Sequence, residues 1–380
     1  MLAAVATALL LLGAVLVLIY QGFALLLAAQ MPRLDAAPPP STPVRRPKVS
    51  VVIAARDEED DLPDTLASLV AQDYPDLEVV VVDGGSTPRL RGEIADRFPS
   101  VRRLEEPPLP PGWVGKNWAC TVGARATGGE WLLFVDADLR LAPSAVRSTV
   151  DWAEREGAAL VSLAPRVAMV TFWERVVLPF YIQLILTRYR APHVNRPTSR
   201  TALANGQYWL VRRSDYEALE GHAAVRDQLL EDVAIAARFR TAGRPLRIAW
   251  APELAQTRMY RDRSEMFEGL LKNVHGLRFS AVREAGFLTA LVGLFWLPLG
   301  LLPLGIALGS LPLAVAGGLL ALALFGKHVA FARAVGAPAR YGLLYPLAVG
   351  FYVGVVGTSL ARGLRRGTVR WKGRTYPLRP

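Results

Sequence analysis

The sequence has one cysteine, four histidines and long stretches without any charged residue. Cys120 alone excludes a disulfide framework and fits a reducing compartment. The histidines do not show the spacing of zinc ligands. Neither a GxGxxG pattern nor a Walker loop occurs, which disfavours dinucleotide-dependent dehydrogenases and P-loop enzymes. The chemistry of the chain must therefore depend on other residues.

Charge is absent from residues 1–32, 285–326 and 341–361 of this 380-residue chain. A helix that crosses a membrane needs about 20 apolar residues, so these stretches have room for one, two and one spans. Because they contain no charge, a transporter is disfavoured. The charged middle, residues 33–284, is long enough for a catalytic domain. We therefore predict a membrane protein with a soluble insert.

The N-terminal segment, residues 1–32, is predicted to be a transmembrane signal anchor. Its apolar run is much longer than that of a secretory signal peptide, and no Lys or Arg precedes it. Cationic residues follow it instead, so the positive-inside rule places the N-terminus outside and the domain in the cytoplasm, at the cell (inner) membrane. Residues 33–47 contain five prolines and are predicted to be a linker.

The C-terminal region, residues 285–361, is predicted to hold two to three spans, followed by a basic tail at residues 362–380. The tail carries seven Lys or Arg residues and no acidic residue. It either meets anionic lipid headgroups or serves only as a topology signal, and next to an apolar span a nucleic-acid partner is disfavoured. Four full spans would place the tail outside, whereas the positive-inside rule requires it inside. We expect a cytoplasmic tail, with residues 341–361 re-entrant or tilted.

The middle of the chain alternates apolar strands with helices. The predicted strands are residues 49–55, 78–83, 101–104 and 131–135. The predicted helices are residues 62–70, 93–98 and 118–126. This order indicates an α/β domain with a mainly parallel sheet, within residues 48–284. In such sheets ligands bind at the carboxyl ends of the strands.

Polar residues follow three of these strands: Arg56 to Glu58, Asp83, and Asp136 with Asp138. Two carboxylates two residues apart at a strand end point to one side of the sheet. Carboxylate oxygens suit Mg²⁺ or Mn²⁺, which are usually held by one or two carboxylates plus substrate phosphates. The pattern therefore predicts a metal–nucleotide site. Gly84 and Gly85 either bring the backbone close to a ligand or simply form a tight turn.

Four strings in this order resemble the family 2 glycosyltransferases, which use nucleotide sugars and have a GT-A fold. They are Val49 to Glu58 (VSVVIAARDE), Val80 to Thr87 (VVVDGGST), Phe134 to Leu139 (FVDADL) and Leu230-Glu231-Asp232. The resemblance covers roughly Lys48 to Lys272. Other strings are similar to the membrane-bound branch that glycosylates carotenoids and hopanoids: Pro110 to Cys120 (PPGWVGKNWAC), Asn205-Gly206-Gln207, Arg258-Met259-Tyr260 and Lys272-Asn273.

The resemblance implies a role for each matching residue. The donor would be bound by Arg56, Glu58, Asp83, Lys116, Asp136 and Arg258, the metal by Asp138, and Asp232 would be the catalytic base. The acceptor side would include Trp113, Asn205, Gln207 and Glu231. The family usually has two adjacent aspartates in its second motif, and Gly84 replaces the second one. One carboxylate expected at a uracil base is therefore absent.

Several of these residues also have a purely structural interpretation. Residues 229–240 have helical periodicity, so without the upstream motifs Asp232 would be a surface helix residue. Glu231 is either a helper or a helix cap, and Trp113 either lines the site or packs under a loop. Aromatic and cationic residues near 171–190 indicate either an interfacial helix or a buried core helix, and residues 259–271 suit an amphipathic helix.

We thus expect an inverting, metal-dependent transfer of a sugar, such as a UDP-hexose, to a membrane lipid of carotenoid or hopanoid type. One base with no second carboxylate placed as nucleophile favours single displacement. A polyprenyl-phosphate glycosyltransferase is the alternative, with Arg258, Arg261 and Arg263 as a cationic pocket for the acceptor phosphate. A noncatalytic membrane scaffold on a degenerate domain is a further alternative, suggested by Gly84.

Overall fold

The computed structural model describes residues 2–36, 45–277, 280–364, 368–371 and 374–377. Its contacts divide the chain into two compact units. An α/β unit comprises Met31–Ala168 and Tyr189–Met259, and a helical unit comprises Met1–Gln30, Met169–Arg188 and Tyr260–Pro380. Two helices from within the predicted 48–284 domain, α6 (Phe172–Tyr189) and α9 (Arg263–Gly276), therefore group with the helical unit.

The α/β unit is built on a seven-stranded sheet with the order β3-β2-β1-β4-β8-β6-β9. Its strands are β1 (Val49–Ala55), β2 (Leu77–Asp83), β3 (Val101–Glu105), β4 (Trp131–Val135), β6 (Leu160–Ala164), β8 (Tyr208–Arg212) and β9 (Leu246–Trp250). All neighbours are parallel except that β8 runs antiparallel to both β4 and β6. The predicted α/β class with a mainly parallel sheet is confirmed.

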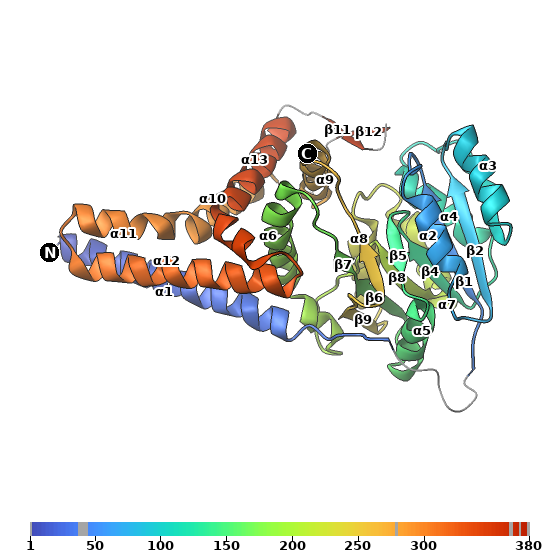
Figure 1. The fold of residues 1–380 in the computed structure, drawn as a ribbon, viewed down its shortest axis with the longest axis horizontal. Helices are drawn as coiled ribbons and strands as arrows, with labels where there is room; N and C mark the ends of the chain where they lie inside the picture. Colours follow the sequence, from blue (N-terminus) through green and yellow to red (C-terminus); the bar gives the residue numbers. More distant parts are fainter. Residues whose placement is uncertain (1, 37–44, 278–279, 365–367, 372–373, 378–380) are drawn as a thin grey trace. The chain divides into compact units, whose positions relative to one another are not determined.

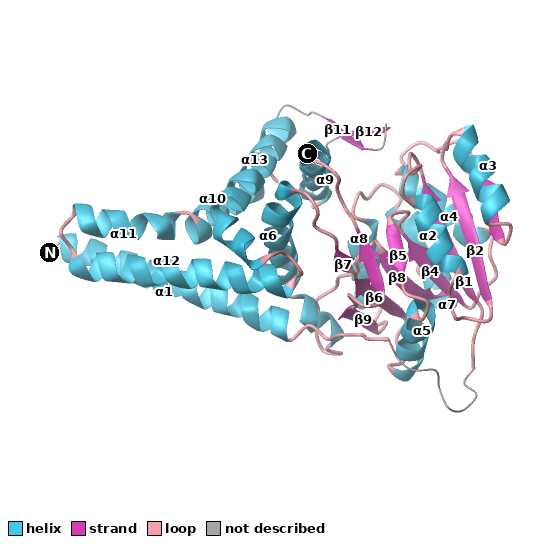
Figure 2. Ribbon diagram, in the orientation of Figure 1, coloured by secondary structure: helices cyan, strands magenta, loops and turns pink. Residues whose placement is uncertain are grey.

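Helices cover both faces of this sheet (Figure 2). On one face, alternate strand residues such as Val51 and Val81 pack in one core with α2 (Leu62–Val70), α3 (Pro88–Arg97) and α5 (Ala145–Arg155). On the other, Val80 and Val82 pack against Ala119 of α4 (Gly115–Arg125). Burial on both faces explains why the strands are continuous apolar runs. Helix α3 begins earlier than predicted because the Thr87 side chain caps it, accepting from the Leu90 N–H.

A second, smaller sheet consists of β5 (Leu139–Leu141), β10 (Ala255–Thr257) and β7 (Arg166–Val167), in that order. These strands follow β4, β9 and β6, respectively, along the chain. Strand β10 pairs antiparallel with β5, so that Thr257 is opposite Leu139. The other α-helices described in the unit are α7 (Arg213–Ala218) and α8 (Glu231–Thr241). Helix α8 matches the predicted helix at residues 229–240.

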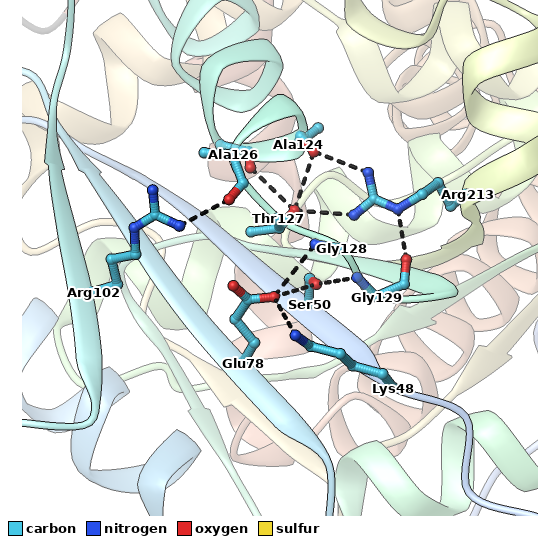
Figure 3. Close-up of polar contacts among 11 residues, drawn as sticks. Lys48, Ser50, Glu78, Arg102, Ala124, Ala126, Thr127, Gly128, Gly129 and Arg213 are labelled. Atoms are coloured by element: carbon cyan, nitrogen blue, oxygen red, sulfur yellow. Dashed lines mark hydrogen bonds and ion pairs between the residues drawn. The ribbon is translucent and has the colours of Figure 1, made fainter.

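Polar contacts fix the loop between α4 and β4 at the amino-terminal edge of the sheet (Figure 3). The Glu78 carboxylate accepts a hydrogen bond from Ser50 Oγ at 3.0 Å and pairs with Lys48 Nζ at 3.1 Å. The Arg213 guanidinium donates to Gly129 O, Ala124 O and Thr127 Oγ1. The carboxyl end of α4 is thus held at this edge, and the amino end of α4, which carries Lys116, reaches the opposite edge.

Both ends of the predicted linker at residues 33–47 are attached to the α/β unit. The Trp250 N–H donates to Pro32 O, and the Leu34 N–H donates to Trp250 O. Arg46 forms an ion pair with Asp151. Residues 37–44 lie outside the described residues.

The helical unit contains α1 (Leu2–Ala29), α10 (Ala281–Phe295), α11 (Leu297–Ala307), α12 (Leu311–Ala334) and α13 (Tyr345–Leu364), besides α6 and α9. Among the described residues, three segments are long and apolar enough to cross a membrane: Leu10–Ala29, Leu311–Ala334 and Ala339–Leu364. Helices α10 and α11 form a fourth if they are one span bent by 50°. Helices α1, α11 and α12 pack together, and α13 packs instead on α9 and α10 (Figure 1). Within the predicted basic tail, β11 (Thr368–Trp371) and β12 (Arg374–Pro377) form an antiparallel pair.

The spans were expected to contain no charge, but the candidate span Leu311–Ala334 contains charged residues. Helix α12 does not end at residue 326 but continues through Lys327, whose exposed fraction is only 7%. Its Nζ lies 2.8 Å from Gln21 Oε1 and 3.4 Å from His328 Nε2, and it also contacts Gln183 Oε1. The uncharged stretch was taken to end before Lys327 because a buried ammonium is costly without hydrogen-bond partners. Its amide partners come from two other helices, so the local sequence does not reveal them.

Candidate active site

The two aspartates after β4 are held by two different segments of the chain. The Asp136 N–H donates to Gln207 O at 3.0 Å. The Oδ2 of Asp138 accepts a hydrogen bond from Thr257 Oγ1 at 2.8 Å. Thr257 reaches Asp138 because β10 pairs with β5, which begins directly after the aspartate. Thr257 was not predicted, although it immediately precedes the predicted Arg258.

Carboxylates are crowded at Asp138. Burial first, then the charges of Asp136 and Glu58, raises the pKa of Asp138 to about 7. Within the described part of the chain, no group of three or more His, Cys, Asp or Glu side chains is placed to hold a metal ion by itself. Two carboxylates at one strand end nevertheless suit Mg²⁺ or Mn²⁺, which commonly rely on substrate phosphates for further ligands. Asp136 and Asp138 therefore fit the expected metal.

Lys116, at the start of α4, connects this aspartate pair to α8. Its Nζ lies 2.6 Å from Asp136 Oδ1 and 2.8 Å from Glu231 Oε1. Burial opposes the charge, but the two carboxylates hold the pKa of Lys116 well above its ordinary value. The side chain is therefore a fixed cation beside the predicted phosphate position.

Asp232 lies in the first turn of α8 and accepts two backbone hydrogen bonds. Its Oδ2 accepts from the Gly206 N–H at 2.6 Å, and its Oδ1 from the Val233 N–H at 2.8 Å. Burial first, and then the charge of Glu231, raises the pKa of Asp232 to about 6. A carboxylate so placed is oriented, yet it gains a proton more readily than an ordinary aspartate.

Gly206 leaves room for this close approach. A Cβ on residue 206 would lie 3.0 Å from Asp232 Oδ2 and 3.4 Å from Lys116 Nζ. The predicted neighbours Asn205 and Gln207 bind each other: Asn205 Nδ2 donates to Gln207 Oε1, and the Gln207 N–H donates to Asn205 Oδ1. Gln207 Nε2 also donates to Thr257 Oγ1 at 3.4 Å, so the segment is linked to Asp138.

On the other side of β4, Arg56 and Glu58 follow β1. Arg56 donates from Nη1 to Gly84 O at 3.0 Å. Between them Asp57 has φ of 55°, in the left-handed region that few residues other than glycine adopt. Such a conformation is retained where the surrounding structure fixes it, often at functional sites.

Asp83 is almost completely buried, with both carboxylate oxygens engaged. Its Oδ1 accepts from the N–H groups of Gly85 and Ser86, and its Oδ2 pairs with Arg91 at 3.2 Å and Arg103 at 3.0 Å. Burial opposes ionisation, but these N–H groups and the Arg91 charge hold the pKa of Asp83 below its ordinary value. Asp83 thus shapes the turn after β2.

The last two predicted site residues are Trp113 and Arg258. Trp113 packs edge to face with Trp118, at 5.1 Å between ring centroids, and Trp118 Nε1 donates to Pro107 O. Arg258 directly follows β10 and thus the Thr257 that binds Asp138. Glu58, Lys116, Asp136, Asp138, Asn205, Gln207, Glu231 and Asp232 are brought together by the contacts and charge interactions described above.

The glycosyl transferase family 2 model matches residues 50–220. The 4,4'-diaponeurosporenoate glycosyltransferase of Staphylococcus aureus is 24% identical over 87% of this chain and 88% of its own length. The enzyme of that name from Staphylococcus haemolyticus is 25% identical over 60% of each chain, so the match spans less than two thirds of that relative.

Among solved structures, a mannosyltransferase from Pyrobaculum calidifontis in complex with GDP-Man and Mn²⁺ superposes with a TM-score of 0.56. It is 22% identical, and the match covers 93% of this chain and 99% of that one. At this identity the likeness concerns the fold, and it agrees with the GT-A architecture expected from the sequence. Residues 50–220 are therefore identified as a family 2 glycosyltransferase domain, and the fold is of GT-A type.

Proposed function

We propose that this chain transfers a sugar from a nucleotide sugar to a membrane lipid acceptor, with inversion at the anomeric carbon. The observation that carries the proposal is Asp232: a carboxylate oriented by the Gly206 and Val233 N–H groups, with a raised pKa, close to Lys116. A general base with a pKa near the working pH is well suited to take a proton in the transition state.

In the proposed reaction, the acceptor hydroxyl approaches C1 of the sugar from the face opposite the diphosphate. Its oxygen forms the new bond to C1 while the bond from C1 to the diphosphate oxygen breaks. The hydroxyl proton passes to Asp232, and the nucleoside diphosphate leaves with the bonding electron pair. Lys116 neutralises part of the leaving-group charge, and Glu231 holds Lys116 in place. A single displacement of this kind inverts the configuration.

Asp138 and Asp136 would hold Mg²⁺ or Mn²⁺ together with diphosphate oxygens. The ion would supply a Lewis acid that neutralises charge on the departing diphosphate. The crowding that raises the pKa of Asp138 supports this assignment, because a bound cation relieves the repulsion between neighbouring carboxylates. Arg56 and Glu58 would contact the nucleoside, and Arg258 would add charge near the phosphates.

A carotenoid-type acceptor is supported by the names of the two staphylococcal relatives. In both names the acceptor word, diaponeurosporenoate, ends in "-oate", which denotes a carboxylate, and a carboxylate needs no base to become a nucleophile. The raised pKa of Asp232 favours a hydroxyl acceptor in this chain instead. Hydroxylated and carboxylated terpenoids assayed side by side would separate the two cases. A polyprenyl phosphate is the third acceptor to include.

We further propose a cytoplasmic catalytic unit and a cytoplasmic tail at the cell membrane. Helices α1, α12 and the bent pair α10–α11 would cross the bilayer, and α13, which packs on α9 and α10, would lie along the surface. Three crossings bring the tail to the same side as the domain, as the positive-inside rule requires. Trp113, Asn205 and Gln207 would face the incoming lipid.

The direct test is incubation of the membrane-embedded protein with nucleotide sugars, Mn²⁺ and a membrane lipid extract. We expect release of nucleoside diphosphate together with a glycosylated lipid detected by mass spectrometry. NMR of the product would give the anomeric configuration, and retention would contradict single displacement. Absence of diphosphate release with every donor and acceptor class would contradict the proposal itself.

A further inference from the structure

The missing side chain of Gly84 is compensated in space by another carboxylate. A Cβ on residue 84 would lie 2.4 Å from Glu106 Oε2, so the Glu106 side chain occupies the place where a residue 84 side chain would begin. The same point is 3.3 Å from Ala55 O at the end of β1. Glu106 follows β3, and its N–H donates to Asp83 O at 2.9 Å. Its carboxylate is thus at the carboxyl edge of β1, β2 and β3.

Glu106 lies on the side of the crevice where a nucleobase would be. In open α/β sheets a nucleotide binds at the carboxyl ends of the strands where the strand order reverses, here between β1 and β4. Asp136 and Asp138 mark the diphosphate at β4, and Asp232 lies beyond them at α8. The nucleoside must then extend the other way, over β1 toward β2 and β3.

Asp83 is poorly suited to bind a base in this chain. Two backbone N–H groups and two arginines already engage its oxygens, and only 2% of the residue is exposed. Glu106 is less buried, and its carboxylate lies at the backbone of Gly84. Glu106, which directly follows β3, is therefore better placed than Asp83 to supply the carboxylate that Gly84 lacks.

We propose that Glu106 reads the nucleobase of the donor and sets its nucleotide preference. The inference rests on the proposed nucleotide-sugar activity. A carboxylate accepts hydrogen bonds and donates none. Uracil and guanine present a ring N–H on their pairing edge, whereas cytosine and adenine present a ring nitrogen lone pair there. Glu106 should select uridine or guanosine diphosphate donors and disfavour those of cytidine and adenosine.

The test is a set of dissociation constants for UDP, GDP, CDP and ADP, measured with Mn²⁺ on the full-length protein. Glu106→Gln should weaken the preferred diphosphate by about 10- to 100-fold, the usual value of a hydrogen bond to a charged group. The same change should bring the preferred and disfavoured nucleotides closer together in affinity. Glu105→Gln removes the same charge from the exposed preceding residue and should leave the preference unchanged.

A carboxylate swap gives a second, independent test. Gly84→Asp alone should weaken binding, because its Cβ would collide with Glu106 Oε2. Combining it with Glu106→Ala removes the collision and returns a carboxylate to the same place, so the original preference should reappear. Unchanged preference in Glu106→Gln, or failure of the folded double variant to regain it, would overturn the inference. If the unaltered protein binds no nucleotide, it is the proposed function that fails.

Discussion

Lys116 Nζ lies 2.8 Å from Glu231 Oε1, and this ion pair joins the amino ends of α4 and α8. Lys116 also pairs with Asp136, so one ammonium connects the residues assigned to the diphosphate with the helix that carries the proposed base. The sequence suggested that Glu231 is either a helper residue or a helix cap. In the structure its carboxylate forms an ion pair with Lys116.

Lys116→Met should therefore lower both the stability of the fold and the affinity for the donor. The change leaves Asp136 and the buried Glu231 without their shared cation, at a cost of about 1–3 kcal/mol for unpaired groups. Thermal unfolding and nucleotide dissociation constants measure the two effects. Lys116→Arg keeps the charge and should recover most of the stability. A Lys116→Met protein that binds donor normally would remove Lys116 from the phosphate site.

Asp232→Asn should abolish transfer while leaving donor binding intact. An amide cannot accept the hydroxyl proton, and loss of a general base typically lowers the rate by about 10²- to 10⁴-fold. Turnover and nucleotide affinity should be compared with those of Asp96→Asn, a change of the same type at an exposed position on α3. Retained turnover would exclude Asp232 as the base for a hydroxyl acceptor.

The transfer rate should fall as the pH decreases through about 6. Burial and Glu231 raise the pKa of Asp232, so below that pH the carboxylate is protonated and cannot act as a base. Above it the base is available and the rate should reach a plateau. The profile should be measured with saturating donor and Mn²⁺, so that metal binding does not limit the rate. A rate independent of pH between 5 and 7 would contradict the assignment.

The parallel core of the fold could be predicted because its central strands are short apolar runs between turn residues. Val49–Ala55 and Trp131–Val135 coincide with strands β1 and β4. The antiparallel β8 was not predicted, because Tyr208–Arg212 is a short aromatic run whose direction depends on distant partners. The grouping of α6 and α9 with the apolar helices likewise depends on contacts that no local pattern encodes.

In the candidate site, too, the residues that follow a recognisable strand could be predicted, and those that depend on distant contacts could not. The aspartates at strand ends are recognisable from the strands before them. Thr257 and Glu106 are not, because each acts through a residue that lies elsewhere in the sequence. Gly206 lies within a recognised string, but its hydrogen bond to Asp232 could not be read from that string. Lys116 was identified only as a charge near phosphate, and its pairing with Glu231 could not be read from either string.

Asp138→Ala should abolish metal-dependent nucleotide binding. The change removes the carboxylate expected to bind Mn²⁺, whereas Thr257→Val removes only the hydroxyl that orients it and should weaken Mn²⁺ by a smaller factor. A titration of nucleotide binding against Mn²⁺ measures both, and chelation by EDTA should make the unaltered protein resemble Asp138→Ala. An unchanged Mn²⁺ titration in Asp138→Ala would exclude it as a metal ligand.

Lys327→Met should destabilise the helical unit, because the ammonium joins α12 to α1 and α6. Its Nζ donates to Gln21 Oε1 and Gln183 Oε1, and neither glutamine is more than 4% exposed. Without the ammonium both amide oxygens stay buried and unpaired, at about 1–3 kcal/mol each. Arg333→Met, at an exposed position of the same helix, is the control and should have little effect.

The triple variant Lys327→Met, Gln21→Leu, Gln183→Leu replaces the whole polar network, whereas Lys327→Met alone leaves the two glutamine oxygens unpaired. Replacing a whole buried polar network by apolar side chains is often neutral or stabilising, whereas removing one partner is costly. Among the described residues Gln183 Nε2 has no hydrogen-bond partner, so the network is incompletely satisfied even in the unaltered chain. Thermal unfolding in nanodiscs should therefore show recovery in the triple variant. If Lys327→Met unfolds at the temperature of Arg333→Met, the ammonium does not hold these helices together.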